Sequence, residues 1–388
     1  MASRFRILVV HNVYQQRGGE DAVVEAEVAL LKAHGHEVLE YRRDNAEIAG
    51  MSQFRLLGDT LWSARASRDL VASANRFVPD LVHVHNTFPL ISPAIYWAAG
   101  RIAVPVVQTL HNFRLMCLNA LFLRRGSVCE DCMGRVPWRG VSRGCYRHSR
   151  TASAAAAGML MLHRQMGTYR NKVACYIALN EFCRRKFVDG GLPADRVWVK
   201  PNFVDFDAPQ SFAREAFLFV GRMSEEKGVA TLADSMALIS DTRLRVAGDG
   251  PEVYRLRGRQ DVTWLGKLSG EEVRGEMSRA TALIMPSIWY ESFPRTIVEA
   301  FACGLPVIAS RLGAMAELVG DGRTGLLFAP GDAHDLAQKV IWAQSHPEEM
   351  RTMGMNARRE YEARYTPEIN YRQLLAIYEH AVAGVKRE

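Results

Sequence analysis

Two glutamates eight positions apart mark the stretch from Pro286 to Ala300, which reads PSIWYESFPRTIVEA. Glu291 falls in the expected turn after an apolar strand, and Glu299 falls about two turns into the helix that follows. The start of that helix, near Thr296, offers free backbone amides that suit a phosphate group. A carboxylate one or two turns into such a helix can accept hydrogen bonds from both hydroxyls of a ribose. Because Glu299 has apolar neighbours, its ionised form needs partners, which favours a binding role.

A second candidate site is the loop that follows the expected strand 217–220. It begins Gly221-Arg222 and contains Lys227, so two cations stand five residues apart at the end of a strand. Open parallel sheets bind their ligands at this edge. Two fixed cations can clamp a diphosphate without a metal ion. The alternative interpretation is a surface turn with two solvated bases.

Two further turns contain glycines at the ends of expected strands. Gly18 and Gly19 precede a predicted helix, and Gly248, Asp249 and Gly250 follow the predicted strand 244–247. Glycine lets the backbone approach a ligand closely, and the start of a helix leaves N–H groups available to an anion. Both turns therefore suit a phosphate or a sugar, although each also fits an ordinary tight turn.

Four of the seven cysteines follow the spacing C-x11-C-x2-C-x12-C, namely Cys117, Cys129, Cys132 and Cys145. This spacing is typical of a structural zinc site, and disulfides are rare in the cytosol. The surrounding segment, about 114–150, shows little helix or strand periodicity, so a metal would supply folding free energy that a small core cannot. Free or redox-active thiols and an iron–sulfur cluster are the alternatives, and His148 is a possible substitute for one thiolate.

The elements that position these residues predict an α/β protein with parallel sheets. Strand-like runs rich in Val, Ile and Leu alternate with amphipathic helical stretches almost from end to end. His83 and His85 alternate along one of these strands, and we interpret them as core or cleft-edge residues rather than a metal pair. The expected strands are 6–12, 37–41, 80–85, 105–110, 174–179, 196–200, 216–220, 244–247, 262–265, 282–285, 306–309 and 325–328.

With 388 residues, the chain has the length of two domains. The break falls near Lys200-Pro201-Asn202, and residues 203–213 have the character of a linker. We expect an N-terminal domain over residues 1–200 and a C-terminal domain over residues 214–366. Residues 367–388 carry apolar side chains at helical spacing and predict a terminal helix with one face to bury.

The charge is unevenly distributed along the chain. The net charge is +7, and residues 101–200 alone carry 17 Lys or Arg against five Asp or Glu. Such a bias suggests an anionic partner, for which nucleic acid, an anionic membrane surface and a lipid-phosphate acceptor are candidates. A solvated basic face is the alternative. No RNA- or DNA-binding motif accompanies the charge, which disfavours nucleic acid.

The sequence offers no clear targeting or membrane-spanning segment. The apolar run at the start, Ile7 to Val10, is too short for a signal peptide and fits a buried strand. The longest small and apolar run, Ala152 to Leu162, is far short of the about 20 residues needed to span a bilayer. We therefore expect a cytoplasmic protein, with peripheral contact at the inner membrane face as an extension of the charge argument.

Taken together, these motifs resemble glycosyltransferase family 4, the retaining enzymes of the two-domain GT-B fold. The resemblance covers nearly the whole chain, and its strength lies in the joint order and spacing of motifs that are individually common. The matching segments are Gly18-Gly19, His111 after an expected strand, Lys200-Pro201-Asn202, Gly221-Arg222 with Glu226-Lys227-Gly228, Gly248-Asp249-Gly250, Glu291 with Glu299, residues 304–310 and residues 321–325.

The resemblance implies two Rossmann-like domains with parallel sheets facing across a cleft, and a terminal helix that packs back on the N-terminal domain. The activity implied is transfer of a hexose from a nucleotide-diphosphate sugar to an acceptor hydroxyl, with retention of configuration and no catalytic metal. The acceptor would be a carbohydrate or a lipid-linked sugar in cell-surface polysaccharide or glycolipid synthesis. The cysteine-rich insertion, which follows His111, would overhang the acceptor side.

The resemblance also implies roles for single residues. Arg222 and Lys227 would hold the donor diphosphate, Glu291 would bind the transferred sugar, and His111 would lie near the reacting sugar; these four form the expected catalytic set. The chain departs from the family at Pro294, where many relatives carry glycine, so one backbone N–H near Glu291 is lost. The expected donor-binding residues are Gly18, Gly19, Gly221, Gly248, Asp249, Ser292, Phe293, Thr296 and Glu299.

Two alternatives remain open from the residues. An epimerase-type or non-catalytic GT-B protein would share the donor pocket but would need no acceptor site. A basic module that docks on a membrane or a nucleic acid would carry only a vestigial donor site. Against this second alternative, the four charged residues expected at the donor site are all present, namely Arg222, Lys227, Glu291 and Glu299.

Overall fold

The computed structural model describes residues 4–15, 18–205 and 214–385 and divides the chain into two compact units. Unit 1 comprises Met1–Leu121, Glu130–Pro201 and Asn370–Glu388, and unit 2 comprises Phe122–Cys129 and Asn202–Ile369. Most of the predicted linker, residues 206–213, and the last three residues of the predicted terminal helix lie outside the described residues.

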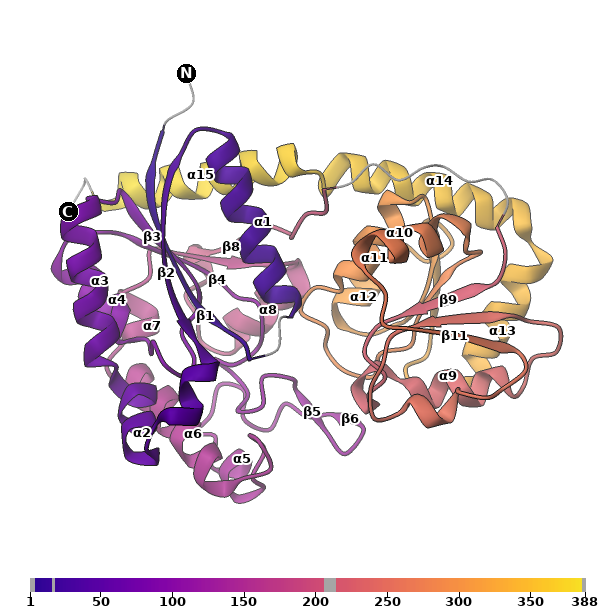
Figure 1. Ribbon diagram of the computed structural model, residues 1–388, viewed down its shortest axis with the longest axis horizontal. Helices are drawn as coiled ribbons and strands as arrows, with labels where there is room; N and C mark the ends of the chain where they lie inside the picture. Colours follow the sequence, from indigo (N-terminus) through magenta and orange to yellow (C-terminus); the bar gives the residue numbers. More distant parts are fainter. Residues whose placement is uncertain (1–3, 16–17, 206–213, 386–388) are drawn as a thin grey trace. The chain divides into compact units, whose positions relative to one another are not determined.

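Unit 1 is built on a six-stranded parallel sheet with the strand order β2-β1-β3-β4-β7-β8 (Figure 1). The central strands are buried on both faces, as expected of apolar runs that helices cover on each side. The six strands are β1 (Arg6–Val13), β2 (Glu37–Asp44), β3 (Leu81–Asn86), β4 (Val106–Thr109), β7 (Cys175–Ala178) and β8 (Val197–Val199).

The terminal helix α15 (Pro367–Val385) contributes to the core of unit 1. Its side chains Leu374 and Tyr378 are fully buried and pack with Ile7 and Val9 of β1 and with Val24 of α1. The other helices of unit 1 are α1 (Gly19–Ala33), α2 (Gln53–Trp62), α3 (Ala64–Phe77), α4 (Ala94–Arg101), α5 (Trp138–Ser142), α6 (Arg150–Gln165), α7 (Thr168–Asn171) and α8 (Glu181–Asp189), with 3-10 turns at Asn45–Gly50 and Ala194–Arg196.

Unit 2 contains a second six-stranded parallel sheet, with the order β11-β10-β9-β12-β13-β14. Two hydrophobic clusters form its core. The strands are β9 (Phe217–Val220), β10 (Leu244–Ala247), β11 (Val262–Gly266), β12 (Leu283–Met285), β13 (Val307–Ser310) and β14 (Gly325–Phe328). The helices are α9 (Val229–Met236), α10 (Gly270–Arg279), α11 (Arg295–Ala302), α12 (Gly313–Leu318), α13 (Ala333–Ser345) and α14 (Pro347–Arg364), with 3-10 turns at Glu225–Lys227 and Val253–Arg255.

The fold class predicted from the sequence is confirmed, because both sheets are parallel and each of the twelve predicted strands overlaps a strand of the structure. The cysteine-rich segment is more ordered than its sequence pattern indicates. It contains a two-stranded antiparallel hairpin, β5 (Leu123–Arg124) and β6 (Ser127–Val128), and the short helix α5. Elements of two to five residues are too short to produce a detectable hydrophobic period.

Candidate functional site

The strand order of unit 2 creates a ligand-binding edge between β9 and β12. Counted along the chain, its six strands run 3-2-1-4-5-6, the order of dinucleotide-binding sheets, and ligands bind beside the carboxyl ends where this order reverses. The loop after β9 carries Lys227, and the loop after β12 carries Glu291. The crossover therefore brings together two side chains that are 64 residues apart in the sequence.

Glu291 is held by three hydrogen bonds to one carboxylate oxygen. Its Oε1 accepts from Lys227 Nζ at 2.6 Å, from Ser287 Oγ at 2.9 Å and from Trp289 Nε1 at 3.0 Å. Only 6% of Glu291 is exposed, and the Lys227 ammonium also lies 5.6 Å from the centre of the Trp289 ring. No described residue hydrogen-bonds to Oε2 of Glu291, so this second oxygen is left for a ligand.

Glycines allow the loops of this site to approach each other. A Cβ on Gly248 would lie 1.9 Å from the carbonyl oxygen of Gly221, and a Cβ on Gly228 would lie 1.9 Å from that of Pro286. Gly228 also adopts a left-handed conformation, with φ of 70°, at the start of α9. These contacts show that packing alone requires glycine at both positions. The side chain of Asp249 is engaged within this turn, because its Oδ1 accepts a hydrogen bond from the N–H of Gly250 at 2.8 Å.

Helix α11 presents Glu299 beside an arginine that the sequence analysis did not single out. Arg295 Nε lies 3.0 Å from Glu299 Oε1, one helical turn away. Burial raises the pKa of Glu299, and the Arg295 charge partly opposes this effect. The i,i+4 spacing of the two residues was the signal that could have identified the pair. Glu299 thus has one cationic partner within its own helix.

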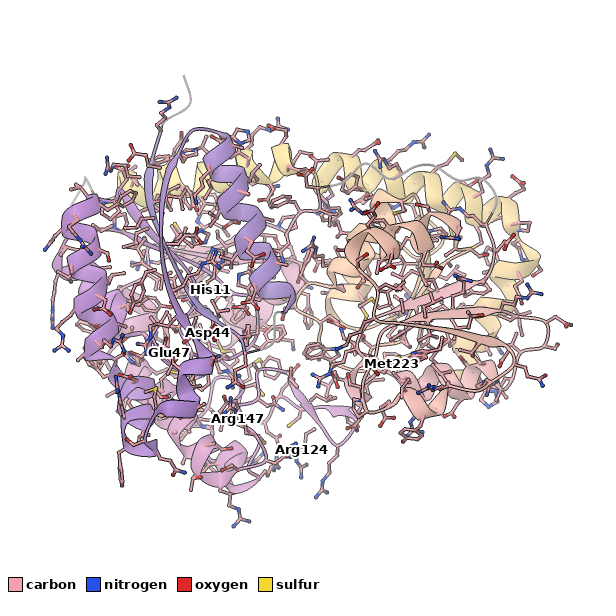
Figure 2. All side chains as sticks on the ribbon, in the orientation of Figure 1. His11, Asp44, Glu47, Arg124, Arg147 and Met223 are labelled. Carbon is pink, nitrogen blue, oxygen red and sulfur yellow. The ribbon has the colours of Figure 1, made fainter. Side chains whose placement is uncertain are left out.

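The other predicted donor-site residues surround this edge. Arg222 is exposed in the loop after β9 and forms no ion pair with a described residue. Ser292 is buried, and Phe293 packs against the core and against the ring of Tyr365. The hydroxyl of Thr296 points back to the sulfur of Met285, at 3.8 Å. Gly221 directly follows β9. The position of this loop can be found in Figure 2 by the label of Met223, two residues further along.

Unit 1 has a comparable edge, where a histidine lies within two residues of the end of each of three strands. Its strand order reverses between β1 and β3, and His11 and His85 lie near the ends of β1 and β3, whereas His111 follows β4 (His11 is labelled in Figure 2). His85 Nδ1 lies 2.9 Å from His111 Nε2, and His11 Nε2 lies 2.8 Å from Asp21 Oδ1. The sequence analysis identified His111 alone as a site residue and missed His11 and Asp21.

Burial keeps these three rings neutral. It lowers the pKa of His11, and it lowers the pKa values of His85 and His111 well below 6.5, with neighbouring histidines adding to the effect for His85 and His111. A neutral imidazole has one N–H donor and one acceptor nitrogen. The cluster can therefore bind hydroxyl groups without placing a positive charge at the edge of the sheet.

The Gly18-Gly19 turn is tied to the same edge through α1. Asp21 accepts from the N–H of Gly18 at 2.8 Å, and Tyr14 Oη donates to Glu20 Oε2 at 3.0 Å. Burial raises the pKa of Glu20 to about 8. Arg17, which precedes the two glycines, lies outside the described residues.

Two family models match this chain and together cover residues 17–360. The model for glycosyl transferases group 1 matches residues 207–360, and the model for Glycosyltransferase Family 4 matches residues 17–208. The chain belongs to glycosyltransferase family 4. The resemblance stated from the motifs is thereby confirmed.

Relatives of this family-4 glycosyltransferase include the phosphatidyl-myo-inositol mannosyltransferase of Mycobacterium leprae, which is 31% identical over 237 residues. That match covers 56% of this chain and 62% of the relative, so the chain spans less than two thirds of that protein.

Two solved structures share the fold. Sucrose-phosphate synthase from Thermosynechococcus elongatus superposes with a TM-score of 0.73 at 20% identity, over 98% of this chain and 100% of the other. Anabaena HepE, solved in complex with UDP, superposes with a TM-score of 0.67 at 18% identity, over 96% and 98% of the two chains. These likenesses span nearly the whole chain and confirm the GT-B fold for the family-4 chain.

The four spaced cysteines of this family-4 glycosyltransferase lie in and around the hairpin segment. Gly140 lies close to two of them. Its carbonyl oxygen accepts a hydrogen bond from the N–H of Cys145 at 2.9 Å, and a Cβ added to Gly140 would lie 3.3 Å from Cys132 Sγ. Cys117 is buried and its thiol donates to Asn119 Oδ1 at 2.9 Å. Cys129 belongs to the segment grouped with unit 2.

None of the helices in the described ranges combines the length and the apolar character needed to cross a membrane.

Proposed function

We propose that this family-4 glycosyltransferase moves a hexose from a nucleoside-diphosphate sugar to an acceptor hydroxyl with retention of configuration, in the synthesis of a cell-surface polysaccharide or glycolipid. The observation that carries the proposal is the Lys227–Glu291 pair, held by Ser287 and Trp289 where the strand order of unit 2 reverses. The named activities of relatives, including a phosphatidyl-myo-inositol mannosyltransferase, support the class of reaction.

The donor would bind along the carboxyl ends of β9 and β12. Lys227 and the exposed Arg222 supply two positive charges for the diphosphate, and neither needs a metal ion to act. Glu291 offers its second carboxylate oxygen to a hydroxyl of the transferred sugar. Glu299 is the fifth residue of α11, a little over one turn from its start and nearer to it than the two turns expected from the sequence, and a carboxylate there suits the ribose hydroxyls.

The family resemblance implies the course of the proposed reaction. The acceptor oxygen forms a bond to the anomeric carbon while the bond from that carbon to the diphosphate oxygen breaks, and the acceptor proton passes to a donor phosphate oxygen. Negative charge grows on the departing diphosphate, and cations fixed in advance stabilise it as it forms. Gly18, Gly19 and His111 of unit 1 would face the reacting groups, as the family resemblance implies.

A surface of unit 1 supports contact with an anionic membrane. Helices α2 and α5 both pack on α6 (Figure 1), and they expose large apolar side chains, among them Phe54 at 88% and Trp138 at 62%. The exposed residues Arg135, Arg147 and Arg150 lie in and beside α5 and α6 (Arg147 is labelled in Figure 2). Exposed apolar side chains together with arginines suit the boundary between anionic headgroups and acyl chains. Such contact would bring the enzyme to a lipid-linked acceptor at the inner membrane face.

We also propose that Cys117, Cys129, Cys132 and Cys145 bind a structural zinc ion. The C-x11-C-x2-C-x12-C spacing supports this assignment, as does the scarcity of regular structure between residues 114 and 137. A zinc ion in this segment would act on folding rather than on the transfer reaction.

The experiment that tests the donor assignment is a thermal-shift screen against UDP, GDP, ADP and their common sugar conjugates, without added metal. A ligand at about 100 times its dissociation constant adds about 2.7 kcal/mol of stability. We expect one nucleotide family to stabilise the wild type and to leave Lys227→Ala and Glu299→Ala unshifted. The absence of any nucleotide-dependent shift in the wild type would contradict the proposed function.

A further inference from the structure

A fully buried polar cluster lies beneath His111 in unit 1. Glu27 of α1 and Lys200, which follows β8, form an ion pair in which Lys200 Nζ lies 2.8 Å from Glu27 Oε2. Lys200 also donates to Asn370 of α15 at 3.1 Å. All three residues are at most 2% exposed. A charge pair of this kind, closed off from water, needs every remaining partner in place to be tolerated.

Two histidines of β3 complete the cluster. His83 has both ring nitrogens engaged, with Tyr378 Oη at 2.7 Å and Thr109 Oγ1 at 2.9 Å. His85 uses Nδ1 for its bond to His111, and its Nε2 lies 3.5 Å from Glu27 Oε1. No hydrogen bond of standard length satisfies either of these last two atoms, and His83 Nδ1 also lies 3.2 Å from Glu27 Oε1.

The cluster does not fit a metal ion. The ligand atoms of Glu27, His83 and His85 lie within 4.8 Å of one another, which is close enough for one. However, the Lys200 ammonium already neutralises the carboxylate, and a divalent cation would add charge beside it in a fully buried site. His83 also has no nitrogen to spare. The cluster is therefore a network of buried polar contacts that leads from Lys200 through Glu27 and His85 to His111.

The charge of Glu27 determines which ring nitrogen of His85 carries the proton. Burial by itself raises the pKa of Glu27, but Lys200 and His83 outweigh burial and hold the pKa below 4.5, so the carboxylate is ionised. An ionised oxygen next to His85 Nε2 favours the proton on that nitrogen. Because His85 is neutral, its Nδ1 then has a lone pair and must accept.

The acceptor at His85 Nδ1 in turn requires a donor, which is the Nε2–H of His111. His111 is also neutral, so its other nitrogen, Nδ1, carries the lone pair. No described residue hydrogen-bonds to that Nδ1, and the residue is partly exposed. It is the one ring atom of His111 left to accept a hydrogen bond from a ligand.

We propose that Glu27 and His85 are positioning residues that hold His111 in the Nε2–H tautomer, so that its Nδ1 accepts a substrate hydroxyl. Asn370 and Tyr378 place the terminal helix α15 in the same network. The tautomer follows from the contacts of unit 1 alone. Its consequence for turnover rests on the proposed function, in which His111 lies near the reacting sugar.

The direct test is long-range proton–nitrogen NMR on the full-length protein labelled with ¹⁵N-histidine, without any nucleotide. We expect His111 to show a protonated Nε2 and an unprotonated Nδ1. His85→Phe removes the acceptor and should release this preference, whereas His85→Asn can accept through its side-chain oxygen and should retain it. A wild-type spectrum with the proton on Nδ1 would overturn the proposal whatever the variants do.

Kinetics provide a second readout that a merely structural role would not produce. Losing one neutral hydrogen bond to the substrate should lower kcat by roughly 10-fold in His85→Phe, with donor affinity unchanged and with recovery in His85→Asn. His163→Phe is the matched control, because His163 is a fully buried histidine of unit 1 outside the network. Equal loss in both phenylalanine variants would overturn the positioning role. If no nucleotide binds, the proposed function fails while the tautomer result still stands.

Discussion

Lys227 Nζ donates to Glu291 Oε1 over 2.6 Å, and the two residues reach each other from loops on either side of the strand reversal in unit 2. Lys227, which is expected to bind the diphosphate, is thus held in place by Glu291, which is expected to bind the transferred sugar. A change in either residue moves the other, so effects on donor binding and on turnover should be coupled.

Replacing Lys227 with methionine should remove a charge from the donor site and leave Glu291 without its cation. We expect the transfer rate to fall roughly 10²–10³-fold and the nucleotide-dependent thermal shift to disappear. Lys339→Met is the control, because the ion pair that Lys339 makes among the described residues is a long, solvent-screened contact of 3.9 Å with Asp335 in the same unit. Turnover assays on both variants check this, and an active Lys227→Met enzyme would contradict the assigned role.

Gly248→Ala should destabilise unit 2 even without a ligand. Its Cβ would meet the carbonyl oxygen of Gly221 at 1.9 Å, and the φ of 150° is strained for any other residue. We expect a loss of about 3 kcal/mol in the free energy of unfolding, measured by urea denaturation. Gly270→Ala serves as the control, since nothing lies within 4 Å of its added Cβ. Similar losses in the two variants would show that the close contact is not the cause.

Glu20 should make the protein less stable as the pH rises. Its folded pKa of about 8 lies above 4.5, so the folded state holds a proton that the unfolded state has released between these values. The stabilisation is complete below pH 4.5 and is lost as the pH rises through 8. Glu20→Gln cannot titrate and should flatten this part of the curve of unfolding free energy against pH, measured in urea. Glu37→Gln, at an exposed carboxylate of unit 1, should keep the wild-type slope.

The apolar side chains on α2 and α5 should bind anionic vesicles. Phe54→Ser with Trp138→Ser should reduce co-sedimentation with vesicles of phosphatidylglycerol and phosphatidylcholine by roughly 10-fold. High salt should release the wild type, because arginine contacts to headgroups are screened. Tyr254→Ser, which alters a side chain of unit 2 that is 65% exposed, is the control. Unchanged sedimentation of the double variant would contradict the membrane contact.

The cysteine segment should release zinc when its ligands are changed. Metal analysis of the purified protein is expected to find one zinc ion per chain, and Cys132→Ser should lower this value and the melting temperature together. Cys303→Ser, at a buried cysteine of unit 2, should leave the zinc content unchanged. A wild-type protein without zinc, whose thiols at Cys117, Cys129, Cys132 and Cys145 all react with an alkylating agent, would refute the site.

Local pattern was sufficient for the twelve strands of the two parallel sheets, but not for β5, β6 and α5. Most of the twelve are short apolar runs, and the helices between them have one apolar face, so neighbouring residues alone indicate both. The same local signals located the loops after β9 and β12 and the glycines at strand ends. The Arg295–Glu299 pair also had a local signal, the i,i+4 spacing, which the sequence analysis did not use.

The partners of the site residues were decided only by tertiary structure. Glu27, His85 and Lys200 lie on three different elements, and Glu27 is 173 residues from Lys200 in the sequence. Their meeting depends on which strands are adjacent and on the return of α15 to unit 1, and no local period encodes strand order. The same holds for the protonation state of His111, because it follows from burial and from a carboxylate two contacts away. Sequence thus determined the family and the loops proposed to carry the chemistry, whereas packing decided how each of these side chains is held.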